Sequence, residues 1–111
     1  MALTNSPDLL PGTLDLLILR TLRQETLHGY AIVQRIKVTS DDVLQVGESS
    51  LYPALQRLLA AGCVKAEWGT SDNNRRARFY TITAIGMKRL RAENKAYERM
   101  SAAIAGVLRT A

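Results

Sequence analysis

The sequence predicts a mainly α-helical domain with one β-hairpin, an α+β fold class, and two neighbouring segments carry that prediction. Residues 49–62 place Leu51, Leu55, Leu58 and Leu59 at helical spacing and end at a glycine. Residues 64–83 then alternate as two strands would, on either side of an arginine-rich turn. A helix with a polar outer face beside an arginine-tipped hairpin is the outline of a winged helix-turn-helix, a DNA-reading device.

The central helix has recognisable ends. Ser49 or Ser50 is expected to cap its start by accepting a hydrogen bond from a free backbone N–H. Pro53 then falls in the first turn, where a missing N–H is tolerated, and Gly62 ends the helix. The leucine stripe faces the core, which leaves a polar face of Ser49, Ser50, Tyr52, Gln56 and Arg57.

The hairpin follows directly. Val64, Ala66 and Trp68 alternate with charged residues, and this period of two predicts a half-buried strand. The return strand is expected from about Arg78 to Thr83, after a turn-forming segment over residues 69–77. Arginines stand at the end of this turn, at positions 75, 76 and 78. Trp68 and Phe79 are interpreted as hairpin packing rather than as ligand or base stacking.

Two further helices precede the central one. Residues 1–12 are expected to be a flexible lead, and Thr13 to cap a helix whose apolar residues are Leu14, Leu16, Leu17, Ile18, Leu19 and Leu22. After a short polar connection over residues 23–29, a second helix carries Tyr30, Ile32, Val33 and Ile36, and residues 39–42 end it. Residues 43–46 form an extended link. These helices complete the three-helix core of a helix-turn-helix.

Thr83 is expected to cap a last helix that runs to about Leu108. Such a helix is about 37 Å long, too long for a small core to cover, and its apolar residues approach heptad spacing. The sequence therefore predicts a homodimer, with residues 1–86 as the DNA-binding domain and residues 87–111 as a dimerisation helix in the same compact unit. The expected interface consists of Leu14, Leu17, Ile18, Leu90, Tyr97, Met100, Ile104, Val107 and Leu108.

Composition sets the class of protein. The chain has 111 residues and a formal net charge of +5, and residues 65–91 hold seven basic residues against two acidic ones. A polyanion would be drawn to that segment, although charge alone fits a solvated basic face equally well. We expect a cytoplasmic protein, because a single cysteine excludes an internal disulfide and neither a signal peptide nor a membrane-length apolar run is present.

Enzyme and metal chemistry find little support in the sequence. There is no glycine-rich phosphate loop, no nucleophile with an evident base and no convincing pair of carboxylates. His28 has no cluster of cysteines or carboxylates at ligand spacing, so no metal and no cofactor are expected. Cys63 is interpreted as a packed thiol, because the chain has no second cysteine to resolve an oxidised one.

Three motifs in order resemble the PadR family of bacterial transcriptional regulators. They are Leu27-His28-Gly29-Tyr30-Ala31-Ile32, then Ser50-Leu51-Tyr52-Pro53-Ala54-Leu55 with Arg57-Leu58, then Arg75-Arg76-Ala77 with Phe79-Tyr80, Ile82-Thr83 and Gly86. The resemblance covers roughly residues 12–90. The short tail after Gly86 is similar to that of the small members, which end in a single helix.

The resemblance implies a homodimeric winged helix-turn-helix, usually a repressor, that binds double-stranded DNA on a pseudo-palindromic operator. The implied DNA-binding residues are Ser49, Ser50, Tyr52, Pro53, Gln56 and Arg57 on the recognition helix, and Arg75, Arg76 and Arg78 on the wing. Gln56 suits adenine, Arg57 guanine or phosphate, and Tyr52 either a phosphate or packing. Output would be set by a small hydrophobic or aromatic effector, or by none. The alternative is a winged-helix protein-interaction module that never touches DNA.

Overall fold

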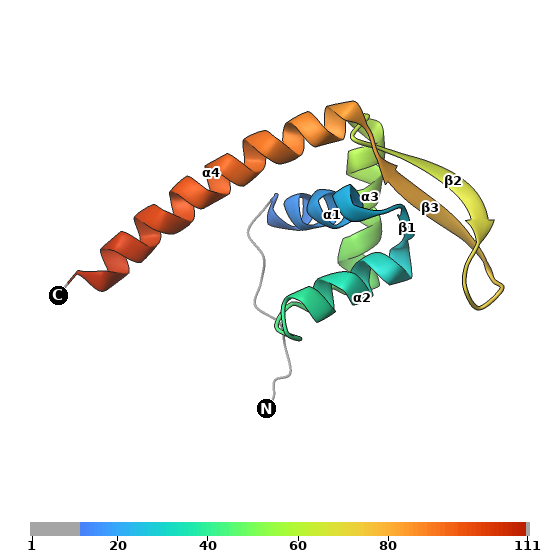
Figure 1. Ribbon diagram of the computed structural model, residues 1–111, viewed down its shortest axis with the longest axis horizontal. Coiled ribbons are helices and arrows are strands. Elements are labelled where there is room, and N and C mark those ends of the chain that lie inside the picture. Colours follow the sequence, from blue (N-terminus) through green and yellow to red (C-terminus); the bar gives the residue numbers. More distant parts are fainter. Residues whose placement is uncertain (1–11, 111) are drawn as a thin grey trace.

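The computed structural model describes residues 12–110, which form four helices and three strands (Figure 1). In chain order these are α1 (Thr13–Gln24), β1 (Leu27–His28), α2 (Gly29–Thr39), α3 (Glu48–Ala60), β2 (Val64–Thr70), β3 (Arg76–Ile82) and α4 (Ala84–Arg109). The predicted fold class is confirmed: three short helices, a small antiparallel sheet and a long C-terminal helix. The flexible lead expected over residues 1–12 lies outside the described residues except for Gly12, which is the N-cap of α1.

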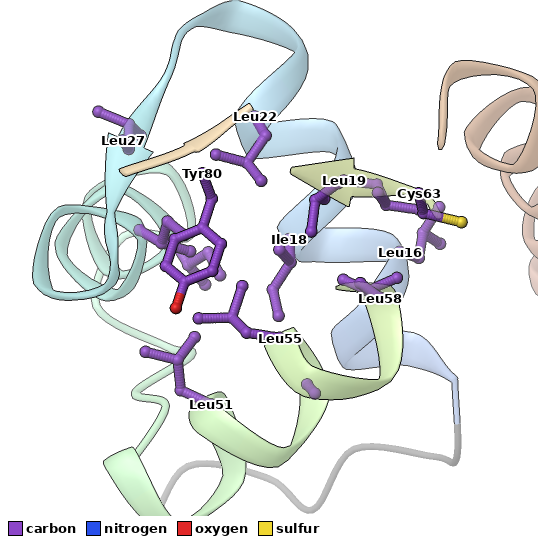
Figure 2. Packing of buried hydrophobic residues seen from close by; sticks show 14 of the residues in the cluster. Leu16, Ile18, Leu19, Leu22, Leu27, Leu51, Leu55, Leu58, Cys63 and Tyr80 are labelled. Carbon is purple, nitrogen blue, oxygen red and sulfur yellow. The ribbon is translucent and has the colours of Figure 1, made fainter. Parts of the chain in front are cut away.

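The core lies between α1, α2, α3 and the base of the sheet (Figure 2). Ile18 and Leu19 of α1 and Ile32 of α2 are completely buried there. From α3, the leucine stripe contributes Leu51, Leu55 and Leu58, while Leu59 is only half-buried. Rotation of α3 about its own axis would expose this leucine stripe. Burial of one face of α3 therefore fixes which residues the opposite face presents to solvent.

The sheet is larger than the sequence predicts, because β1 adds a third strand in the order β1-β3-β2. Leu27 pairs with Tyr80 and His28 with Phe79, in a segment expected to be a polar connection. A two-residue strand shows no periodicity that sequence alone could reveal.

The return strand also starts two residues earlier than expected, because Arg76 pairs with Thr70 and Arg78 with Trp68. The turn is accordingly shorter than predicted and spans Ser71 to Arg75, closed by a 2.8 Å hydrogen bond from Ser71 N to Arg75 O. Asn74 supplies the left-handed backbone of this turn, with φ 60°.

Two of the three predicted helix caps are wrong. The N-cap of α3 is Gly47, whose carbonyl accepts from Ser50 N and Leu51 N, so neither serine caps the helix. Because α3 begins at Glu48, Pro53 lies in the second turn and removes one internal hydrogen bond. In α1 the N-cap is Gly12 rather than Thr13. The prediction for α4 is confirmed: Thr83 caps it, its hydroxyl accepting from Gly86 N at 3.1 Å.

The end of α3 and the start of α4 meet at one junction. Gly62 ends α3 with φ 75°, and the amide of Cys63 donates to Leu58 O at 2.9 Å, a Schellman closure. Thr83 N donates to Cys63 O at 3.0 Å, and the Thr83 hydroxyl donates to Gly62 O at 2.6 Å. Gly86 completes the junction, because a Cβ there would lie 2.1 Å from Cys63 O.

From this junction the first part of α4 runs beside α1, and its C-terminal part projects away from the rest of the molecule (Figure 1). Of its 26 residues only Gly86 and Leu90 are buried. Large apolar side chains further along the helix are exposed: Tyr97, Met100, Ile104, Val107 and Leu108. None of the helices within residues 12–110 has the length and hydropathy that crossing a lipid bilayer requires.

Replacing Gly86 with alanine is expected to lower the free energy of unfolding by about 2 kcal/mol or more, because the added methyl group must displace backbone atoms rather than a flexible side chain. Urea denaturation followed by circular dichroism measures this change. The matched control is Gly106→Ala in the same helix, where a Cβ meets nothing within 4 Å. That substitution should stabilise the protein by up to about 1 kcal/mol through helix propensity. Equal and small effects of both substitutions would contradict close packing at the junction.

Candidate nucleic-acid interface

The outer face of α3 presents polar and small side chains to solvent. Ser49, Ser50, Tyr52, Pro53, Gln56 and Arg57 are all exposed, as the sequence predicts. Tyr52 and Gln56 are four residues apart and therefore share one side of the helix. Arg57 is displaced by about 100° from Gln56 around the axis and points to a different neighbour.

A groove with a volume of about 380 Å³ separates this face of α3 from the wing. Its lining brings together residues from the start of α2, from α3 and from both strands of the hairpin: His28, Gly29, Tyr30, Tyr52, Gln56, Trp68, Arg76, Ala77, Arg78 and Tyr80. Four of the expected DNA-binding residues therefore share a single concave surface, namely Tyr52, Gln56, Arg76 and Arg78. Ser49, Ser50, Pro53, Arg57 and Arg75 are not among its lining residues.

The three wing arginines occupy different environments. Arg76 and Arg78 are two residues apart in β3 and so share one face of the sheet. The Arg76 guanidinium lies 4.9 Å from the centre of the Trp68 ring, and that of Arg78 lies 5.9 Å from the centre of the Tyr80 ring. Arg75 is instead the last residue of the turn, and its side chain is exposed.

Trp68 packs within the hairpin against Arg76, as expected, but it is not buried, because β2 and β3 extend beyond the core. Its side chain is 60% exposed at the groove. Phe79, on the other face of the sheet, also packs: its ring meets that of His28 edge to face, with centroids 5.3 Å apart. Burial raises the pKa of Tyr80, so its phenol is neutral at physiological pH.

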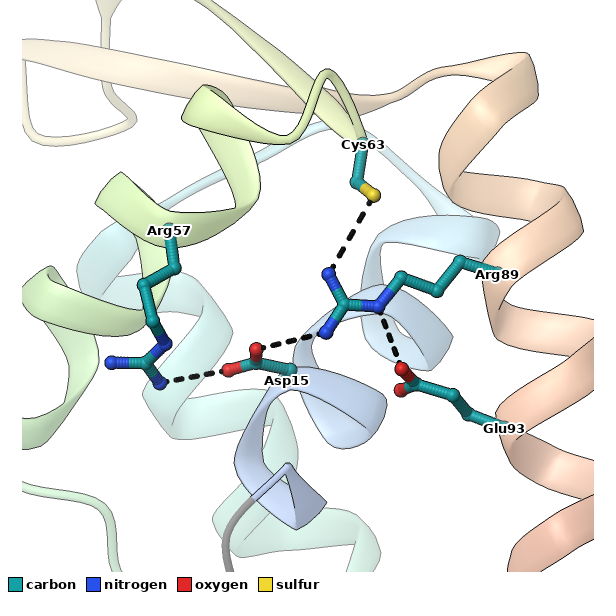
Figure 3. Close-up of polar contacts among 5 residues, drawn as sticks. All are labelled: Asp15, Arg57, Cys63, Arg89 and Glu93. Carbon is teal, nitrogen blue, oxygen red and sulfur yellow. Dashed lines mark hydrogen bonds and ion pairs between the residues drawn. The ribbon is translucent and has the colours of Figure 1, made fainter.

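Arg57 is tied to the interior of the protein by a buried carboxylate (Figure 3). Its Nη2 donates to Asp15 Oδ1 at 3.0 Å, and Asp15, on α1, is only 4% exposed. The other oxygen, Oδ2, accepts from Arg89 Nη2 of α4 at 3.2 Å. Arg57 is therefore a link between α3 and α1 as well as a surface residue, which its exposure alone would not show.

Arg89 extends this polar cluster along α4. Its Nε donates to Glu93 Oε2 at 2.6 Å, and its Nη1 contacts Cys63 Sγ at 3.8 Å. The hydrogen bond to Glu93 raises the pKa of Arg89 above its ordinary value, so this guanidinium stays charged. Sequence reasoning missed Asp15, because its two partners lie 42 and 74 residues away and it stands in an apolar helix.

His28 and Cys63 have structural environments. His28 is the N-cap of α2, where its Nδ1 accepts from Ala31 N at 3.3 Å. Cys63 is buried beside Arg89. Among the described residues, no three side chains of the metal-binding types are grouped so as to hold an ion.

The residues expected at a dimer interface divide into two groups. Ile18 and Leu90 are buried within the single chain, so they have no surface left for a partner. Leu14 and Leu17 of α1 are half-buried, and Tyr97, Met100, Ile104, Val107 and Leu108 of α4 are exposed. The second group can still contribute contact area.

Comparison with known proteins identifies the arrangement. The model of the transcriptional regulator PadR-like family matches residues 18–92. An uncharacterised protein of Lysinibacillus sphaericus is 32% identical over 79 residues, which are 71% of this chain and 72% of that protein. A transcriptional regulator of Clostridium thermocellum superposes with a TM-score of 0.78 at 28% identity, covering 86% of this chain and 92% of that one. A PadR family regulator of Eggerthella lenta superposes with a TM-score of 0.73 at 29% identity, covering 90% of this chain and 85% of that one.

Replacing Asp15 with asparagine is expected to lower the free energy of unfolding by about 2 kcal/mol, because two guanidinium groups lose the carboxylate that balances them. Urea denaturation at one fixed protein concentration measures the change. Glu25→Gln is the control, since Glu25 forms an exposed ion pair with Arg35 at 2.6 Å. That pair should contribute under about 1 kcal/mol. Equal losses for the two variants would show that Asp15 does not hold the three helices together.

Proposed function

The chain belongs to the PadR-like family of transcriptional regulators, and we propose that it is a sequence-specific repressor that binds a pseudo-palindromic operator as a homodimer. Proteins of this family, and the structural neighbours, are transcriptional regulators rather than enzymes. The observation that carries the proposal is the shared groove, which sets the exposed side chains of α3 opposite a wing bearing two oriented arginines.

In the proposed complex α3 enters the major groove of DNA. Gln56 offers both a donor and an acceptor in one plane, which matches the major-groove edge of adenine. Ser49 and Ser50, in the first turn of α3, and Pro53, in the second, approach the phosphates. The partial positive charge at the helix N-terminus favours an anion there, and the serine hydroxyls can donate to it. Tyr52 reaches a phosphate from the wall of the groove.

The wing and Arg57 provide the electrostatic part of the interaction. Arg76 and Arg78 face the same groove and would contact phosphates or a narrow minor groove, and Arg75 stands at the tip, one residue before β3. Arg57 is 58% exposed although one of its nitrogens is held by Asp15, so its remaining N–H groups are available to a phosphate. These contacts add affinity without reading sequence.

The homodimer is supported by the apolar stripe of α4. Side chains of this size exposed along one helix face are unfavourable in water and are typical of an interaction surface. A second copy of the same helix offers a matching stripe, and a two-fold axis would place two α3 helices on half-sites about one turn, ~34 Å, apart. The half-buried Leu14 and Leu17 would extend the interface onto α1.

Repression and release follow from the same arrangement. A dimer bound across an operator blocks access of other proteins to that DNA, and the family resemblance implies this direction of control. If a small hydrophobic or aromatic effector acts on the protein, the apolar seam between two α4 helices is the surface of matching chemistry. Such a ligand would change the spacing of the two α3 helices and thereby the affinity for the operator.

Replacing Arg76 and Arg78 together with alanine is expected to weaken binding to every DNA sequence and to reduce the slope of log K against log salt by about 2, because two phosphate contacts are lost. Fluorescence anisotropy with duplexes from the protein's own upstream region, between about 50 and 200 mM salt, measures both. The control is Arg99→Ala with Arg109→Ala, which removes the same charge from the far part of α4.

Gln56→Ala should behave differently and relax the preference at one base position, with little change in the salt slope. If neither the wing variant nor Gln56→Ala alters DNA binding, the docking arrangement is wrong and the interaction-module alternative is favoured.

Replacing Ile104 with glutamate is expected to weaken self-association at least about tenfold, because the partner would have to bury an unpaired carboxylate. Sedimentation velocity over a dilution series measures it. Ala102→Glu adds the same charge at an exposed position about 160° away around the helix, off the apolar stripe, and should leave association unchanged. A monomeric wild-type protein, or equal effects of the two variants, would contradict dimerisation through this stripe.

A further inference from the structure

Trp68 is the single tryptophan of the chain, and its location is unusual for so large an apolar side chain. It is 60% exposed, in the part of β2 that extends beyond the core. The inward-facing positions nearer the core are already filled by Val64, which is buried, and Ala66, which packs against the core cluster. Burial in the core therefore gives no reason for an indole at this position.

What Trp68 does contact is the wing arginine pair. It is paired in register with Arg78, and the Arg76 guanidinium lies over its ring, 4.9 Å from the centroid. Arg78 in turn lies over Tyr80, so aromatic and cationic side chains alternate along this face of the wing. A guanidinium stacked on a ring uses its flat face and keeps its in-plane N–H groups free to bind an anion.

We propose that Trp68 is a positioning residue for Arg76 and that the sugar–phosphate strand of bound DNA covers its indole. This inference rests on the proposed function and extends it to a residue that reads no base. An unrestrained arginine loses rotamer freedom when it binds a phosphate, whereas one held on an indole has already lost part of it. The stacking thereby strengthens each phosphate contact that Arg76 makes.

The groove identifies the occupant as a DNA strand. One wall of this protein groove is α3, which is proposed to enter the major groove of DNA. The opposite wall is the wing, which is proposed to contact the neighbouring minor groove. The backbone strand between those two DNA grooves would therefore run along its floor. Its phosphates match Arg76 and Arg78, and the less polar faces of its deoxyribose rings match the exposed indole of Trp68 and the Tyr30 ring.

A single tryptophan makes the inference directly measurable by fluorescence. In the free protein, Arg76→Gln should increase quenching of Trp68 by acrylamide, because the guanidinium no longer shields one face of the ring. Arg75→Gln is the matched control: it removes the same charge one residue earlier, from an exposed turn position, and should leave quenching unchanged. Addition of a duplex from the upstream region to the wild-type protein should reduce quenching below that of the free protein, as the DNA covers the indole.

Affinity provides the second measurement. Trp68→Leu keeps an apolar side chain but loses the aromatic face, and should weaken DNA binding about two- to fivefold, while Trp68→Phe should stay closer to wild type. In the Arg76→Gln background the loss caused by Trp68→Leu should be clearly smaller, because the stacked partner is already gone. Melting curves confirm that each variant is folded.

The outcomes separate this inference from the proposed function. Wild-type protein that binds no DNA overturns both. Wild-type protein that binds DNA while Trp68 stays equally accessible to acrylamide overturns the covering of the indole alone. Strictly additive losses for Trp68→Leu and Arg76→Gln, or equal quenching in the two arginine variants, overturn the positioning of Arg76.

Discussion

The junction between residues 62–63 and residues 83–86 is the constraint on which the rest of the structure depends. Within these few residues α3 ends, β2 begins, β3 ends and α4 begins, and the backbone hydrogen bonds among them leave no space for a side chain at Gly86. Helix α3, the wing and the long C-terminal helix therefore diverge from one rigid point. A change in the angle of α4 at this point would therefore also shift α3 or the hairpin.

The Asp15 cluster provides a second connection between α3 and α4, by way of α1. One buried carboxylate receives a guanidinium from α3 on one oxygen and a guanidinium from α4 on the other. With Glu93 included, two carboxylates balance two arginines, so the cluster is neutral as a whole and the buried charge of Asp15 is compensated. Because ion pairs of this kind are directional, they restrain the rotation of α3, which apolar contacts of Leu51, Leu55 and Leu58 resist less sharply.

Local patterns in the sequence were sufficient to predict the elements that depend on neighbouring residues. The leucine stripe of α3, the stop at Gly62 and the cap at Thr83 are all encoded within a few positions. What could not be predicted depends on distant pairing. Strand β1 exists because Leu27 meets Tyr80, and Asp15 is significant only through Arg57 and Arg89. The helix starts at Gly12 and Gly47 were misplaced because a glycine N-cap competes closely with a nearby serine or threonine.

The basic residues between positions 65 and 91 show that a count of charges overestimates the number of basic side chains available at a binding surface. Seven basic residues lie between positions 65 and 91, yet Arg89 is held by Asp15 and Glu93 within the protein. Arg76 and Arg78 are stacked on aromatic rings at the groove, and Arg75 remains free at the turn. A segment that appears uniformly basic is thus divided between Arg89, which holds α4 to α1, and the wing arginines, which are proposed to contact DNA. Since few arginines face the groove, the proposed affinity for DNA would depend on their orientation more than on their number.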